Sequence, residues 1–262
     1  LVPVAGLALL AGVALGAFGG QDIVLRLKDR FGSADEAGKL AIVDAWAEPA
    51  SYEAGGRAEL ESTAAEAKGG FVAVHAAATL SRLGAPDELG FGRLATFVKD
   101  GTTDERRMAI RLLPIDHAET EAVLVRASQD ADESVALLAW VRLYARASSR
   151  RGKNDELSAQ AEKKLLEWER SKAAGKETLA HQARAALAAY GSKDVLSHLT
   201  RERASKDADA RVVAAQGLIR LRAFQTVAPL LADEDATVRR TVACQLLTTF
   251  PADPDAHPSQ TH

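Results

Sequence analysis

Arginine recurs at one position of a ten-residue pattern, Ala-apolar-x-x-apolar-x-Arg-Leu-x-Ala. Its three copies are AAATLSRLGA from Ala76, ALLAWVRLYA from Ala136 and AAQGLIRLRA from Ala214. The seventh position holds Arg82, Arg142 and Arg220. Placed at the same point of successive helices, these arginines could form a row that faces a partner, although the row is broken at Ala189. In the alternative interpretation, each arginine lies along its helix edge or pairs with an aspartate of a neighbouring turn.

Histidine and cysteine, which could supply catalysis or metal binding, are scattered along the chain. His75, His117, His181 and His198 lack the paired spacing that places two metal ligands on one helix face. Cys244 is the single cysteine, and its apolar helix-like surroundings predict a buried small side chain rather than a reactive thiol. The sequence also contains no nucleophile or phosphate-loop motif. We therefore expect no catalytic, cofactor or metal residues, and a protein that is not an enzyme.

The arginine pattern belongs to a longer repeat. Three weaker copies begin at Glu105, Ala183 and Val242, so that successive starts are 29, 31, 47, 31 and 28 residues apart. The repeated unit is therefore about 30 residues long, with one insertion. Periods of this length are typical of solenoids, whose units bury their apolar faces by stacking on one another.

Acidic turns recur between the helix-like stretches. They lie at Asp100–Asp104, Asp130–Asp132, Asp207–Asp209 and Asp233–Asp235. A helix begins with backbone N–H groups that have no acceptor within the helix, and an aspartate at the cap accepts one of them. These turns therefore predict helix starts. A calcium loop is the weaker interpretation, because the turns lack a long run of oxygen ligands and a closing glutamate.

The segment from Thr226 to Leu247 resembles a HEAT repeat. It has Pro229 in an apolar first helix, an acidic turn, and the Val-Arg pair of the family at Val238 and Arg239. The preceding unit is similar, with Arg211 and Val212 in that place, and the resemblance weakens toward the N-terminus. The resemblance implies an all-α fold, a right-handed α-solenoid (superhelix) of stacked HEAT-like hairpins. It also implies that the groove lined by second helices binds other proteins.

The repeat and the composition divide the chain into four expected parts. Residues 1–20 carry no charge and suit a signal peptide or membrane anchor, or else a buried first helix. We expect a helical cap or degenerate repeats in 21–70, HEAT-like repeats in 71–250 and a disordered tail in 251–262. The protein would then be exported or membrane-anchored, and cytoplasmic if the first segment is not a signal.

The charge balance bears on the class of partner. The chain has 33 basic and 36 acidic residues, a formal net charge of -3, whereas nucleic-acid-binding proteins usually show a basic excess. The insertion between Ser148 and Lys176 is highly charged, with interleaved signs that favour a solvated helix face over a basic binding patch. A thin apolar stripe at Ala159, Leu165, Leu166 and Trp168 predicts one long helix there. We therefore expect no nucleic-acid partner.

Three functions remain compatible with these features. The favoured one is a noncatalytic scaffold that binds a protein or peptide in the groove of the solenoid, with Arg82, Arg142 and Arg220 as the residues that could face it. The second is a HEAT-like lyase or chaperone-type enzyme. The third is a structural subunit of a larger assembly, tethered to a membrane through residues 1–20.

Overall fold

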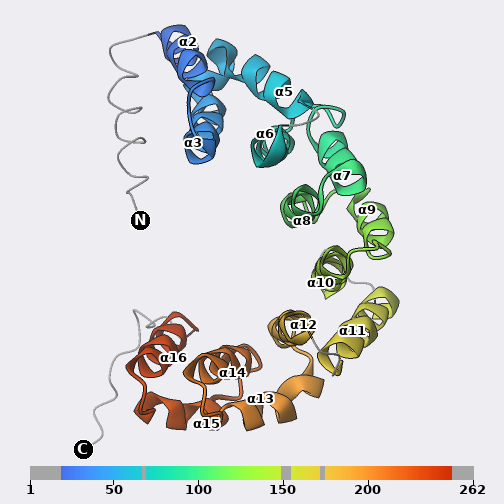
Figure 1. Cartoon of the computed structure of the whole chain (residues 1–262), viewed down its shortest axis with the longest axis vertical. Helices are drawn as coiled ribbons and strands as arrows, with labels where there is room; N and C mark the ends of the chain where they lie inside the picture. The colour runs from blue at the N-terminus through green and yellow to red at the C-terminus, as the bar shows by residue number, and fades with distance from the viewer. Residues whose placement is uncertain (1–18, 67–68, 149–154, 172–174, 250–262) are drawn as a thin grey trace, which may run out of the picture. The chain divides into compact units, whose positions relative to one another are not determined.

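The computed structural model describes residues 19–66, 69–148, 155–171 and 175–249 (Figure 1). Every regular element among them is helical, and these residues contain no strand. The all-α class predicted from the sequence is therefore confirmed. Most of the expected signal or anchor segment and the whole expected tail lie outside the described residues.

The chain divides into two compact units, one on each side of the peptide bond between Arg146 and Ala147. The helices of the first unit are α2 (Gly20–Phe31), α3 (Glu36–Ala47), α4 (Pro49–Ser51), a π-helical turn η1 (Tyr52–Gly56), α5 (Arg57–Ala65), α6 (Gly70–Arg82), α7 (Phe91–Asp100), α8 (Thr103–Leu112), α9 (Thr120–Ala127) and α10 (Glu133–Ser148), which ends just past the division. Helix α6 packs against α5, so the boundary expected at residue 70 lies between two paired helices.

The second unit continues the same alternation of helix and turn. Its helices are α11 (Asp155–Glu169), α12 (Glu177–Ala189), a 3-10 turn η2 (Lys193–Val195), α13 (Leu196–Glu202), α14 (Ala208–Arg220), α15 (Phe224–Val227), a 3-10 turn η3 (Ala228–Ala232) and α16 (Ala236–Thr249). The single apolar first helix expected around Pro229 is divided into α15 and η3. A proline lacks the N–H that an α-helix needs and is tolerated in the tighter 3-10 turn.

Helices in each unit form two layers (Figure 1). In the first unit, α5, α7 and α9 make one layer, and the second helix of each pair, α6, α8 or α10, lies in the other. Helix α6 packs against both α3 and α8. In the second unit, α14 likewise packs against both α12 and α16. Each of these second helices thus contacts the second helix before it and the one after it.

The contacts between successive pairs of the first unit follow the period read from the sequence. Hydrogen bonds join Lys28 to Glu59 and His75 to Asp44, each 31 residues apart, and Arg93 to the carbonyl oxygen of Ala64, 29 residues away. Such separations mean that the same part of one pair meets the same part of the next. The repeated spacing therefore reflects packing of neighbouring pairs within this unit.

All six copies of the ten-residue pattern lie on second helices, on α6, α8, α10, α12, α14 and α16. The first residue of every copy is buried: Ala76, Glu105, Ala136, Ala183, Ala214 and Val242. Leu80, Trp140 and Leu218, at the fifth position of the three clear copies, are also buried. The pattern thus identifies the buried face of one layer, and Gly217 lets α14 approach α13, because a Cβ there would lie 2.7 Å from Leu199 Cδ1.

Two expectations about apolar side chains are wrong. Cys244 is exposed, because it occupies the third position of its copy, and Ala78 and Gln216 at the same position also reach the surface. Ala159 is exposed as well, while Leu157 and Ala161 join Leu165 in the buried stripe of α11. The buried side of α11 is therefore rotated around the helix axis relative to the predicted stripe.

Three of the four predicted acidic turns supply an aspartate cap, and Asp35 caps α3 in the same way. Asp35 accepts a hydrogen bond from Gly38 N, Asp207 from Asp209 N, and Asp235 from Thr237 N at 2.7 Å. Asp132 accepts from Ser134 N at 2.9 Å. At α8 the cap is Thr102, whose hydroxyl and backbone N–H pair reciprocally with Glu105.

An arginine at the fourth residue of a second helix links one turn to the next. Arg211 donates from Nη1 to the carbonyl oxygens of Ser205 and Lys206 in its own turn, and from Nε and Nη2 to Asp233 of the following turn, both at 2.8 Å. Arg106 repeats this geometry in the first unit. Its Nη1 donates to Gly101 O, and its Nε lies 2.9 Å from Asp130 Oδ2.

We term this arrangement the arginine–aspartate rung. Its aspartate, Asp130 or Asp233, lies two residues before the helix cap and also accepts the N–H of the cap residue, Asp132 or Asp235. Helix α10 has Ala136 at the fourth position and therefore no arginine for such a rung. The rung gives a physical reason for the arginine at the fourth residue of α8 and of α14.

We predict that Leu218→Asp unfolds the second unit. Leu218 is fully buried, so the substitution removes apolar packing and buries an unpaired carboxylate, at a cost of at least about 3 kcal/mol. Urea denaturation followed by circular dichroism measures it. Leu247→Asp is the control, because Leu247 is 72% exposed in the same layer; equal stability of the two variants would contradict the stacking.

We also predict that the protein loses stability in acid. The Arg211 hydrogen bond lowers the pKa of Asp233, the Ser134 hydroxyl lowers the pKa of Asp132, and the backbone N–H of Val238 lowers the pKa of Asp235. The unfolded chain therefore takes up protons first as the pH falls below about 4. This stabilisation is present above that pH and is lost as the pH falls through the lowered values.

Thermal melts between pH 7 and pH 3 test this linkage. We expect the Tm to be level from pH 7 to pH 5 and to fall below about pH 4, with a shallower fall for Asp235→Asn. A Tm that rises on acidification would show that the caps and the rung do not carry the predicted charge.

Candidate binding face

Exposed arginines lie on two neighbouring second helices of the first unit, α6 and α8. Arg82 at the end of α6 and Arg111 in the last turn of α8 are both exposed, and α6 packs against α8. Arg107 lies one turn before Arg111 and is half-buried, with its Nη1 3.6 Å from Asp104 Oδ1. We call Arg82, Arg107 and Arg111 the basic face. Only one of its guanidinium groups has a carboxylate partner among the described residues.

The three arginines singled out from the sequence do not share one environment. Arg142 is half-buried inside α10, and its Nη2 donates to the carbonyl oxygen of Leu113, just after α8. Arg142 therefore makes a contact within the fold, as in the alternative interpretation of these arginines, although the acceptor is a backbone oxygen and not an aspartate. Arg82 and Arg220 are each the last residue of a helix and are exposed. A cation there complements the negative end of the helix dipole and leaves the guanidinium group open to a partner.

Helix length explains this difference. The pattern starts at the seventh residue of α6 and α14 but at the fourth residue of α10, so Arg142 lies one turn earlier in its helix. Arg146, one turn further on, donates to Ile115 O and lies 3.6 Å from Glu121. Both arginines of α10 therefore contact neighbouring backbone of their own unit.

Two of the histidines, His75 and His117, each lie beside an aspartate. His75 Nε2 lies 2.8 Å from Asp44 Oδ1 across α6 and α3, and His75 is half-buried, as expected for an interior or groove residue. His117 stacks on Phe91 with ring centroids 3.7 Å apart, and its Nε2 lies 3.2 Å from Asp87 Oδ2. Among the described residues, no group of three or more metal-binding side chains could hold an ion.

The second unit contains a buried charge cluster that sequence analysis missed. Arg184 of α12 lies 3.2 Å from Glu169 of α11 and 2.8 Å from Glu202 of α13. His198 joins both carboxylates, with Nδ1 3.2 Å from Glu169 and Nε2 3.0 Å from Glu202. The side chains of Arg184 and Glu169 are only 8% and 9% exposed. This cluster holds three helices together and has no nucleophile.

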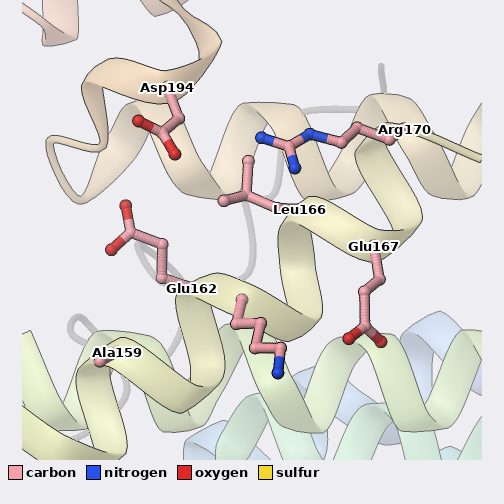
Figure 2. Close-up of a pocket in the computed structure, with 7 residues that line it drawn as sticks. Ala159, Glu162, Leu166, Glu167, Arg170 and Asp194 are labelled. Carbon is pink, nitrogen blue, oxygen red and sulfur yellow. The ribbon is translucent and has the colours of Figure 1, made fainter.

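A shallow hollow lies beside this cluster, along the outer side of α11 (Figure 2). Its volume is about 340 Å³, and it is lined by Ala159, Glu162, Lys163, Leu166, Glu167, Arg170 and Asp194. Figure 2 shows the carboxylates of Glu162 and Asp194 pointing into it, while the guanidinium group of Arg170 extends over Leu166. Both signs of charge are present on exposed side chains, which fits a solvated face better than a built ligand site.

None of the described helices is long and apolar enough to cross a membrane. The segment expected to be a signal or anchor contributes only Gly19 and Gly20 to the described residues, and α2 begins at Gly20.

Comparison with known proteins gives no relative: no family model, curated protein or solved structure matches the chain.

We predict that Arg184→Met destabilises the second unit by about 3–5 kcal/mol, because it leaves the buried carboxylate of Glu169 without its guanidinium partner. Arg170→Met, at an exposed arginine next to Glu169, is the matched control and should change stability little. Chemical denaturation measures both. An Arg184→Met protein as stable as the control would mean that the cluster does not hold the helices.

Proposed function

We propose that the protein is a noncatalytic scaffold, a HEAT-like right-handed α-solenoid whose second helices bind a segment of another protein. The repeated pattern supports this proposal, because every copy lies on a second helix with its first residue buried. In a solenoid, that layer lines the groove, and the side chains not used for stacking face the ligand. The resemblance of the last two units to HEAT repeats supports the same architecture.

The single observation that carries the binding role is the basic face of the first unit. Arg82 and Arg111 have no side-chain partner among the described residues, and guanidinium groups on adjacent packed helices suit carboxylates spaced along an extended chain. The chain as a whole is slightly acidic, so this face is a local feature rather than a general attraction to polyanions. The proposed ligand is therefore an acidic peptide segment of a partner protein.

Fluorescence anisotropy with a labelled glutamate-rich 12-residue peptide tests this proposal. We expect binding that weakens with salt and that falls about tenfold in the double variant Arg82→Glu/Arg111→Glu, equivalent to about 1.4 kcal/mol. Arg126→Glu is the control, because Arg126 is also exposed but lies on the first helix α9.

Two outcomes would contradict the proposed ligand. Equal loss of binding in Arg126→Glu would show that the peptide responds to net charge and not to the second-helix face. Equally tight binding of a single-stranded oligonucleotide would identify a general anion site.

A further inference from the structure

The last helix repeats a stacking surface that α14 buries. The matching residues lie 28 positions apart, as Arg211 and Arg239, Ala215 and Ala243, Leu218 and Leu246, and Ile219 and Leu247. In α14, which packs against α15 and α16, all four are buried. In α16, Arg239 and Leu247 are exposed, and Ala243 and Leu246 are partly exposed. Helix α16 therefore carries the same types of side chain at these positions, but no neighbouring helix in the described part of the chain buries them as they are buried on α14.

The arginine of this surface is already oriented for a rung. Arg239 Nη1 donates to the carbonyl oxygens of Asp233 and Glu234, at 2.6 and 3.0 Å, just as Arg211 Nη1 grips its own turn. In Arg211 the other two guanidinium nitrogens bind the carboxylate of the next turn. In Arg239 those nitrogens meet no carboxylate among the described residues. A fixed guanidinium group with a free fork suits one aspartate.

We propose that the edge of α16 formed by Arg239, Ala243, Leu246 and Leu247 docks a helical hairpin of another polypeptide. The turn of that hairpin carries an aspartate that takes the place Asp233 has beside Arg211, and its apolar residues cover Leu246 and Leu247. An apolar residue that is 72% exposed gains from this burial about 25 cal/mol per Å² removed from water. The arginine fixes the orientation of the hairpin.

Charge complementarity favours a different chain over a second copy. A second copy that docked through its helices α2 and α3 would not supply the carboxylate of the rung. Its first described pair, α2 and α3, has Ser33 two residues before the cap Asp35. That is the position at which the rung requires a carboxylate, so self-docking would leave Arg239 unpaired.

Thiol labelling of the full chain tests this edge. Cys244→Ser removes the only native thiol, and Leu247→Cys then places a single reporter on the edge. The probe is an additional hairpin, a copy of residues 222–249 inserted after Thr249. It places an aspartate 22 residues after Arg239, the separation of Asp233 from Arg211. We expect the thiol to react rapidly in the unextended chain and at least about tenfold more slowly in the extended chain.

Two variants test whether the lower reactivity comes from the rung or from a general loss of access to α16. Asp233→Asn in the added copy alone should restore much of the reactivity, whereas a Thr248→Cys reporter, on the exposed face of α16, should stay reactive in both chains. Unchanged reactivity of Leu247→Cys in the extended chain would overturn the proposal.

Labelling of the unextended chain also decides the occupant. Protection at all concentrations would assign the edge to the chain's own residues, and protection that grows with concentration and is lost in Arg239→Glu would assign it to a second copy. Either result would overturn docking of another polypeptide. The basic face takes no part in this readout, so failure here would leave the proposed function standing.

Discussion

In each unit, one guanidinium group holds two consecutive turns and so links two neighbouring helix pairs. Arg106 binds one carbonyl oxygen of its own turn and Arg211 binds two, and each also binds the aspartate of the next turn. Because that aspartate also binds the N–H of the residue capping the following helix, the rung joins the start of one second helix to the start of the next. At these two places the register between pairs is set by directional hydrogen bonds, whereas apolar contact is non-directional.

Stacking on both sides determines which part of a second helix remains for function. Helices α6 and α14 each pack against a second helix before them and one after them, and the first residue of the pattern is buried in every copy. The remaining side carries polar or charged residues, including Arg82 and Arg220. Both surfaces follow from this stacking. The basic face lies beside the contacts between second helices, and the edge of α16 repeats the surface that makes those contacts.

Charged residues serve different purposes at different depths. In the cluster of Arg184, Glu169, His198 and Glu202, the first two are buried and the other two are half-buried. These residues pair largely with one another, so the role of the cluster is cohesion of α11, α12 and α13. Exposed pairs such as Lys164 with Glu167 contribute little by comparison. Arginines with open guanidinium groups at the surface are therefore better candidates for recognition than the more numerous paired charges.

The sequence by itself determined the helices, their caps and their period, because hydrophobic spacing and aspartate caps act within one or two helical turns. The pattern also indicated that its fifth position is buried, whereas Cys244 was wrongly expected to be buried although its position in the pattern points to the surface. Only the tertiary structure decided which arginines pair. Arg211 meets Asp233 and Arg142 meets Leu113, partners 22 and 29 residues away, and such contacts depend on how neighbouring pairs rotate and slide against each other. The Arg184 cluster has the same origin, since three helices must pack before its charges can meet.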